Sequence, residues 1–217
     1  MGKKVNPFGF RLGVLYTWKS RWFANARDYK TLLLQDLELR KFVMAKLKNA
    51  GIINVDIERS IKKIKIYVYV SRPGVVIGRG GSGMEILKKE IMKQLNIKEN
   101  DPKAVKLDVK VEEIKNPNAH AHSIAQRLSD QLIARYPHRR AVKQAIDNAM
   151  DAGVKGVKIQ LAGRIGGAEI ARVEKYGKGT VPTQTIRADI DYDEIPALTK
   201  SGYVGIKVWV NNGEKRI

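Results

Sequence analysis

The chain has 217 residues, and its 41 lysines and arginines outnumber its 22 aspartates and glutamates, which gives a formal net charge of +19 at pH 7. Its length fits one large or two small domains, and its apolar share of 43% can fill a core while the excess cations stay outside it. Because such a charge repels itself in a compact protein, it favours a polyanionic partner, whose phosphates the cations would bind with release of counterions.

The same composition argues against several other classes of protein. No apolar run approaches the roughly 20 residues that a membrane-spanning helix needs, and the basic residues are spread along the chain rather than gathered on one amphipathic helix. The chain has no cysteine, which excludes disulfides, thiol nucleophiles and cysteine-ligated zinc. This composition fits a reducing compartment, and we expect the protein in the cytoplasm.

Residues 1–27 form a basic and aromatic segment without a clear period, which we interpret as an N-terminal arm. Two interpretations of its aromatic side chains are about equally supported. Either they pack on a folded domain, or some of them stack on RNA bases. The candidate RNA-binding cations of this arm are Lys3, Lys4 and Arg11.

Residues 28–115 predict a first folded domain. Its expected elements are, in order, a helix over 28–50, strands over 52–58 and 61–71, a helix over 82–95 and a strand over 105–111. Asp28 is a possible N-cap of the first helix, and Pro73 marks a turn after the second strand. Ser82 and Glu85 fit a capping box at the start of the second helix. The apolar stripe expected on the first helix comprises Leu32, Leu33, Leu37, Val43, Met44 and Leu47.

The turn-rich triplet Asn116-Pro117-Asn118 is the candidate boundary to a second α+β domain over 116–217. Its expected elements are, in order, a helix with Ile124, Leu128 and Leu132, a helix with Val142, Ala145, Ile146, Ala149 and Met150, a strand over 157–161, a glycine-rich stretch over 163–179, and strands near 185–190 and 205–210.

A glycine loop, Gly78-Arg79-Gly80-Gly81, precedes the helix predicted over 82–95. Glycines without Cβ atoms let the backbone N–H groups approach a sugar-phosphate chain, and Arg79 adds a full positive charge. The loop fits the GXXG loop of a KH domain, a plain turn, or the G-x-G-x-x-G turn of a dinucleotide-binding enzyme. The last alternative is weakest, because residues 71–77 separate the strand from the loop and no series of parallel βαβ units follows. The order of elements and the charge favour the KH loop.

Arg139, Arg140 and Lys143 lie in the first turns of the second helix of the C-terminal domain, opposite its apolar stripe. A solvated surface is the ordinary interpretation of such a charge run. Here the cations oppose the helix dipole and repel one another, at a cost of about 0.3–1 kcal/mol each, which an anionic partner would offset. We therefore interpret this sector as an RNA-contacting surface.

A second stretch combines glycines with cations: Gly163 to Gly167 contains Arg164, and Arg172, Lys175 and Lys178 follow. It fits a phosphate contact, and it fits equally the start of a helix and a hairpin.

Other candidate sites are set aside. His120 and His122 are too few ligands for a metal site when the chain has no cysteine. The acidic run from Asp189 to Glu194 lacks the glycine of a calcium loop. We therefore expect these acids to pair with basic groups. No nucleophile, base and orienting group stand at a recognisable spacing. We therefore expect no metal, no cofactor and no catalytic residues.

Several motifs resemble, in order and spacing, those of the bacterial ribosomal small-subunit protein three family. They are Gly2-Lys3-Lys4-Val5-Asn6-Pro7, Gly9-Phe10-Arg11-Leu12-Gly13, Trp22-Phe23-Ala24, the loop from Ile77 to Gly81, Arg139-Arg140 with Lys143, the run from Gly163 to Arg172, Arg187-Ala188-Asp189-Ile190-Asp191-Tyr192 and Gly205-Ile206-Lys207-Val208-Trp209. The resemblance covers nearly the whole chain. It departs at Asn6, at Arg79-Gly80 and at Pro137-His138, where the family usually has other residues.

The resemblance implies an α+β protein with an N-terminal arm, a type II KH domain and a C-terminal α+β domain, which we place at 1–27, 28–115 and 116–217. It implies a structural component of the ribosome rather than an enzyme, bound to ribosomal RNA in the head of the small subunit beside neighbouring head proteins. It also implies that Arg139, Arg140 and Lys143 face messenger RNA where the message enters, next to proteins four and five of the subunit, and assist its unwinding.

Overall fold

The computed structural model describes residues 4–95 and 106–215, which form two compact units. Of these residues, the central unit comprises 18–95 and 106–115, and the terminal unit comprises 4–17 together with 116–215. Each unit is an α+β structure built on one four-stranded sheet, as the sequence predicts. Among the described residues, no helix is long and apolar enough to cross a membrane.

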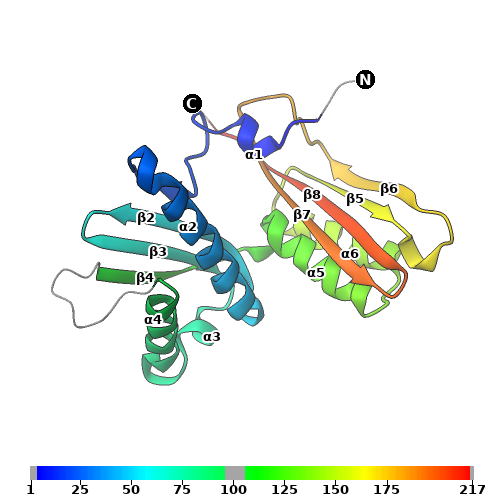
Figure 1. Cartoon of the computed structure of the whole chain (residues 1–217). Coiled ribbons are helices and arrows are strands. Elements are labelled where there is room, and N and C mark those ends of the chain that lie inside the picture. Colours follow the sequence, from blue (N-terminus) through cyan, green and yellow to red (C-terminus); the bar gives the residue numbers. More distant parts are fainter. Residues whose placement is uncertain (1–3, 96–105, 216–217) are drawn as a thin grey trace. The chain divides into compact units, whose positions relative to one another are not determined.

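The central unit has its helices on one face of a mixed sheet (Figure 1). In chain order it contains β1 (Ser20–Arg21), α2 (Ala26–Lys46), the 3-10 turn η1 (Lys48–Ala50), β2 (Ile52–Ser60), β3 (Lys63–Val70), α3 (Pro73–Ile77), the 3-10 turn η2 (Arg79–Gly81), α4 (Ser82–Gln94) and β4 (Lys106–Glu113). The sheet order is β1-β2-β3-β4, with β2 and β3 antiparallel and β3 and β4 parallel.

Strict alternation along β3 decides which face of this sheet is buried. Ile64, Ile66 and Val68 are buried, whereas the lysines and tyrosines between them are only half-buried. The buried side chains meet Leu39 and Val43 of α2 and Leu87 and Ile91 of α4 in a single core. The predicted strands and helices of this unit are therefore confirmed to within a few residues.

Three local expectations for the central unit are wrong. Helix α2 starts at Ala26, with Asn25 at the N-cap position and no side-chain cap, so Asp28 lies inside the first turn. The capping box is absent, because Ser82 Oγ donates to the carbonyl oxygen of Arg79 and left-handed Gly81 takes the N-cap position. Pro73 begins the short helix α3 instead of a simple turn, since proline is well suited to a first helical position.

The buried face of α2 is also shifted from the predicted stripe. Leu33 and Leu37 are exposed, whereas Asp36 is buried. Asp36 tolerates burial because Arg59 Nε donates to its Oδ1 at 2.7 Å and Trp22 Nε1 donates to its Oδ2 at 2.7 Å. This carboxylate therefore holds the segment around Trp22 on the central unit.

The terminal unit places two helices on one face of an antiparallel sheet (Figure 1). In chain order it contains α1 (Pro7–Phe10), the 3-10 turn η3 (Pro117–Ala119), α5 (Ala121–Ile133), α6 (His138–Asp151), β5 (Gly156–Gly163), the 3-10 turn η4 (Ile165–Gly167), β6 (Arg172–Gly179), β7 (Ala188–Thr199) and β8 (Gly202–Glu214). The sheet order is β6-β5-β8-β7, and all three pairings are antiparallel.

The core of the terminal unit lies between this sheet and helices α5 and α6. Ile159 of β5 and Ile206 of β8 pack there against Leu128 of α5 and Ala145 of α6. On the other face of the sheet, called here the outer face, Ile190 and Trp209 form a smaller apolar cluster with Ala188. The two predicted helices are confirmed, and β7 and β8 extend well beyond the predicted strands.

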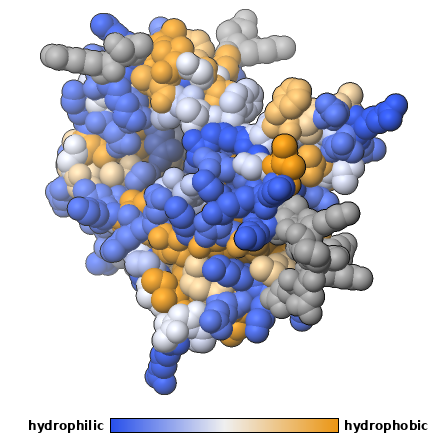
Figure 2. Space-filling view, turned by 90° about the vertical axis from the view of Figure 1, so that its left-hand side faces the viewer, coloured by the Kyte–Doolittle hydropathy of each residue, from blue (hydrophilic) through white to orange (hydrophobic). Residues whose placement is uncertain are grey.

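The arm predicted over 1–27 divides between the two units. Residues up to Thr17 belong to the terminal unit, whereas Ser20 and Arg21 pair in parallel with β2 of the central unit. On the face of the molecule shown in Figure 2, hydrophilic residues predominate and apolar residues form small separate groups.

Candidate RNA interface

The glycine loop of the central unit joins α3 to α4 and is solvent-exposed at Gly78, Arg79 and Gly80. Gly78, Gly80 and Gly81 have φ angles of 70°, 62° and 84°, a left-handed region that side chains with a Cβ rarely adopt. Arg79 has no ion-pair partner within the described part of the chain. The loop therefore presents backbone and one free cation to solvent, as an approach to a sugar-phosphate chain requires.

The two helices that flank the loop come unusually close together. A Cβ built on Gly83 would stand 2.5 Å from the carbonyl oxygen of Val76, nearer than any real contact. Val75, Ile77 and Ile86, all exposed, lie on these helices next to the loop in sequence. Gly83 thus sets the geometry of the helical hairpin, a role distinct from the conformational freedom of the loop glycines.

Helix α6 presents the basic sector predicted from the sequence. Arg139, Arg140 and Lys143 are exposed, and Val142 and Ile146 on the opposite side are buried. The first turn of α6 has no acidic residue, and its N-cap residue offers no side-chain hydrogen bond. The cations therefore stand at the positive end of the helix without an acidic residue in the same turn of α6.

Glu174 of strand β6 brings this helix together with the glycine-rich stretch. Its carboxylate lies 3.2 Å from His138 Nε2 and 2.7 Å from Arg172 Nε, and it accepts a hydrogen bond from the Tyr176 hydroxyl. The Tyr176 hydrogen bond, and then the charges of His138, Arg172 and Arg139, hold the pKa of Glu174 below its ordinary value. Two groups of cations predicted separately from the sequence thus converge on one carboxylate.

The glycine-rich stretch contains both a 3-10 turn and a hairpin strand. Arg164 stays exposed and donates to the carbonyl oxygen of Ala168 at 2.8 Å. Lys178 lies 3.0 Å from Asp147 of α6, on the helix side of β6. Lys175 is exposed on the outer face, in register with Gln160 of β5. The cations of this stretch therefore point to both faces of the sheet.

Arg11, predicted as an RNA contact, is instead a buried structural residue. Its side chain is 0% exposed, and its guanidinium donates to backbone carbonyl oxygens of Ala188 at 2.7 Å, Pro7 at 3.0 Å and Thr185 at 2.9 Å. A guanidinium enclosed by carbonyl groups has no surface left for a phosphate. The sequence pattern shows a cation among aromatics but not the later segment that encloses it. Lys3 lies outside the described residues.

The histidines and acids set aside above pair with one another and with lysines. His122 Nδ1 is 2.6 Å from Asp193, and His120 Nδ1 is 3.5 Å from Asp191. Lys215 and Lys207 pair with Asp189 and Glu194, as expected for acids beside a basic surface. Within residues 4–95 and 106–215, no group of three or more His, Cys, Asp or Glu could hold a metal ion.

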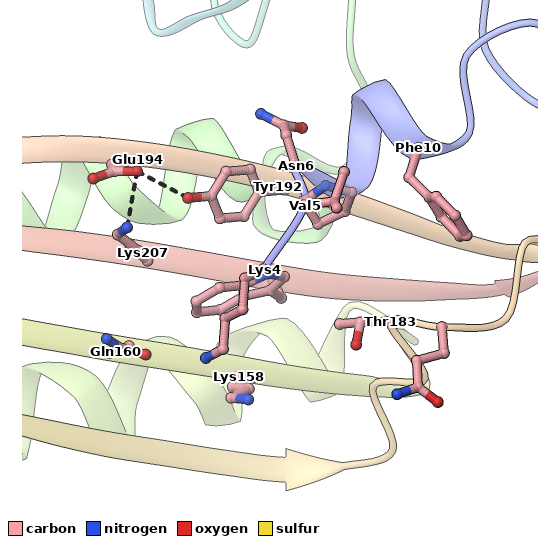
Figure 3. A pocket seen from close by; sticks show the side chains of 13 residues that line it. Lys4, Val5, Asn6, Phe10, Lys158, Gln160, Thr183, Tyr192, Glu194 and Lys207 are labelled. Atoms are coloured by element: carbon pink, nitrogen blue, oxygen red, sulfur yellow. Dashed lines mark hydrogen bonds and ion pairs between the residues drawn. The ribbon is translucent and has the colours of Figure 1, made fainter. Parts of the chain in front are cut away.

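A cavity of about 600 Å³, which no sequence pattern predicts, lies on the outer face of the terminal sheet (Figure 3). Its lining residues come from the N-terminal segment, the loop before β7 and three strands: Lys4, Val5, Asn6, Pro7, Phe10, Lys158, Gln160, Thr183, Gln184, Tyr192, Glu194, Lys207 and Trp209. These residues are far apart in the sequence, so no local pattern predicts that they meet.

Two curated relatives are similar to this chain over almost its whole length. The small ribosomal subunit protein uS3 of Clostridium acetobutylicum is 47% identical over 214 residues, which cover 99% of this chain and 93% of that protein. The uS3 protein of Persephonella marina is 48% identical over 215 residues, which cover 99% and 92%. The chain belongs to the uS3 family.

Two family models match separate parts of this chain. A KH domain model matches residues 38–119, and the model for the C-terminal domain of ribosomal protein S3 matches residues 128–210. The chain is thus a protein of the small ribosomal subunit with an RNA-binding KH domain, and it is not an enzyme. The dinucleotide interpretation of the glycine loop is wrong, since the loop follows a short helix within a KH domain.

Proposed function

We propose that this member of the uS3 family binds ribosomal RNA through the KH loop and the exposed cations of the terminal unit. We further propose that it holds messenger RNA on Arg139, Arg140 and Lys143 where the message enters the small subunit. The observation that carries the messenger role is the exposed triad of cations on the first two turns of α6, opposite a buried apolar side. Neighbouring head proteins and proteins four and five of the subunit are the protein partners proposed with it.

The energetics of α6 support a nucleic-acid role for the triad. Like charges three or four residues apart repel, and cations at a helix N-terminus oppose the dipole, so each lowers the stability of the free protein by up to about 1 kcal/mol. A single strand of RNA would remove both costs by supplying phosphates. Arg139 also interacts electrostatically with Glu174 and Tyr176 of β6.

Unwinding follows if the triad holds one strand while the ribosome advances. Each phosphate contact stabilises the separated strand at the point where a hairpin opens. A strand that is held in this way does not pair again with its complement. The triad would therefore act as a passive clamp, with translocation supplying the work.

The test uses small subunits that carry Arg139→Ala, Arg140→Ala and Lys143→Ala together. We expect assembly and near-normal elongation on unstructured messages, with slower elongation on messages that carry a stable hairpin downstream of the decoding site. A charge-matched variant with Lys62, Lys155 and Lys200 replaced by alanine should show no such difference. Equal slowing on both templates, or none on either, would refute the messenger role, and failed assembly would assign the triad to ribosomal RNA.

A further inference from the structure

The cavity on the outer face of the terminal sheet is formed by strands of the sheet on one side and by the N-terminal segment on the other. In the sheet, Lys158 of β5 is in register with Trp209 of β8, and Gln160 is in register with Lys207. The segment from Lys4 to Phe10 crosses over these strands and closes the other side (Figure 3). A volume of about 600 Å³ lies within the roughly 300–1,000 Å³ of small-ligand pockets.

Gln160 lines this cavity, and its side chain has an unmet hydrogen-bonding requirement. Its Oε1 is buried and has no hydrogen-bond partner among the described residues. A buried amide oxygen left unpaired lowers the stability of the protein, so a hydrogen bond from a ligand to the Gln160 amide would recover free energy. An amide presents an acceptor and donors side by side, which is the pattern that the edge of a nucleobase matches.

The cavity is also positively charged. Lys4, Lys158 and Lys207 line it, and Glu194 is its one acidic residue within the described part of the chain. Glu194 is already engaged, because Lys207 Nζ lies 3.3 Å from it and the Tyr192 hydroxyl donates to it at 2.9 Å. Figure 3 shows these three groups together at one end of the cavity, while Lys4 and Lys158 lie nearer its middle. Two lysines thus remain for an anion.

Aromatic and apolar surface completes the lining. Phe10 is 43% exposed on the N-terminal side, and Tyr192 and Trp209 contact each other with ring centroids 5.2 Å apart. Lys158 Nζ lies 5.4 Å from the Trp209 ring centroid, which places its charge beside an aromatic surface. An inorganic anion would leave the rings and the amide unused, and an apolar ligand would leave the lysines unpaired.

We propose that this cavity binds one nucleotide of an RNA strand. The base would lie against Phe10 and the Trp209 floor, the Gln160 amide would bond its edge, and Lys4 and Lys158 would contact the adjoining phosphate. The proposal rests on the RNA-binding function given above but concerns a site separate from both the glycine loop and α6. Because the cavity is only partly enclosed, a base turned out of a single strand can reach it without a change in the sheet.

The test is photocrosslinking of the full-length chain to a tetranucleotide of uridines that contains one 4-thiouridine, with adducts mapped by mass spectrometry. We expect adducts on Phe10, Tyr192 or Trp209. Gln160→Leu should lower adduct yield at these residues by roughly two- to tenfold, the loss expected for one hydrogen bond. Gln131→Leu, a matched change on α5 outside the cavity, should leave the yield unchanged, and circular dichroism would verify that both variants fold.

Competition separates the possible ligands. Tripolyphosphate should displace the tetranucleotide poorly from the cavity, and Lys158→Gln should weaken adduct formation more than Lys200→Gln does. Displacement by tripolyphosphate as strong as by unlabelled tetranucleotide, or equal yields in wild type and Gln160→Leu, would overturn the proposal. If uridine monophosphate competed more tightly than the tetranucleotide, the ligand would be a free nucleotide, and the proposal that it belongs to an RNA strand would be overturned. The alanine triad variant of α6 should keep these adducts, so the cavity and the messenger role fail independently.

Discussion

Arg11 Nε donates a 2.7 Å hydrogen bond to the carbonyl oxygen of Ala188, which lies 177 residues later in the chain. With its other donors bonded to carbonyl oxygens of Pro7, Thr183 and Thr185, Arg11 fixes the N-terminal segment to the terminal unit. Nearby, the Tyr16 hydroxyl donates to Asp189 at 2.5 Å, and burial together with this bond raises the pKa of Tyr16. The described N-terminal residues, 4–17, are therefore part of the terminal unit.

Arg11→Lys tests this structural role, because it keeps the charge and removes the planar fork of donors. We expect a loss of about 2–4 kcal/mol in the unfolding free energy, since several buried carbonyl groups lose a partner. Urea denaturation followed by circular dichroism measures it, with the exposed Arg187→Lys as control. Unchanged stability combined with weaker RNA binding would restore Arg11 as an RNA contact.

Two glycines of the helical hairpin in the KH domain should respond oppositely to alanine. Gly83→Ala should destabilise the protein by about 1–3 kcal/mol, because its Cβ would collide with the carbonyl oxygen of Val76. Gly74→Ala should be neutral or stabilising by up to about 1 kcal/mol, since no atom lies within 4 Å and alanine favours helix α3. Thermal unfolding of both variants measures the difference in stability. Equal destabilisation by the two changes would count against the close approach of Gly83 to the Val76 carbonyl oxygen.

The double change Arg79→Asp with Gly80→Asp should weaken binding to single-stranded RNA while the fold stays intact. Gly80 has a φ of 62° but open space around it, and aspartate is among the residues that tolerate this region. Filter binding to short single strands measures the effect, with Lys89→Asp on α4 as a charge control. Unaltered affinity would mean that the loop does not grip RNA.

The lowered pKa of Glu174 leads us to expect that the unfolding free energy depends on pH. Its folded pKa lies below the ordinary value of 4.5, so its ionised form stabilises the protein above pH 4.5, and this contribution is lost as the pH falls through the lowered pKa. Glu174→Gln should therefore be less stable than wild type at neutral pH, and the difference should shrink in acid. Urea denaturation at several pH values measures it, and a difference that stays constant with pH would exclude the carboxylate as its cause.

Periodic residues made most of the fold predictable. The alternation in β3 and the apolar repeats of α5 and α6 depend only on local spacing, and the structure confirms them. The exposed triad of α6 was predictable for the same reason. Burial of Asp36 and Arg11 was not, because each depends on partners distant in sequence, Arg59 in one case and Ala188 in the other. The cavity around Gln160 was not predictable for the same reason, since its lining residues come together only in the folded chain.

The most direct test of the account is the salt dependence of binding between the full-length protein and a single-stranded RNA, with wild type and the Arg139, Arg140 and Lys143 alanine variant compared. In a plot of log K against log salt concentration, each phosphate contact to a single strand contributes a slope of about −0.7. We predict a steep line for wild type and a line shallower by about 2 for the variant. Parallel lines of equal slope would contradict the claim that these three cations hold RNA phosphates.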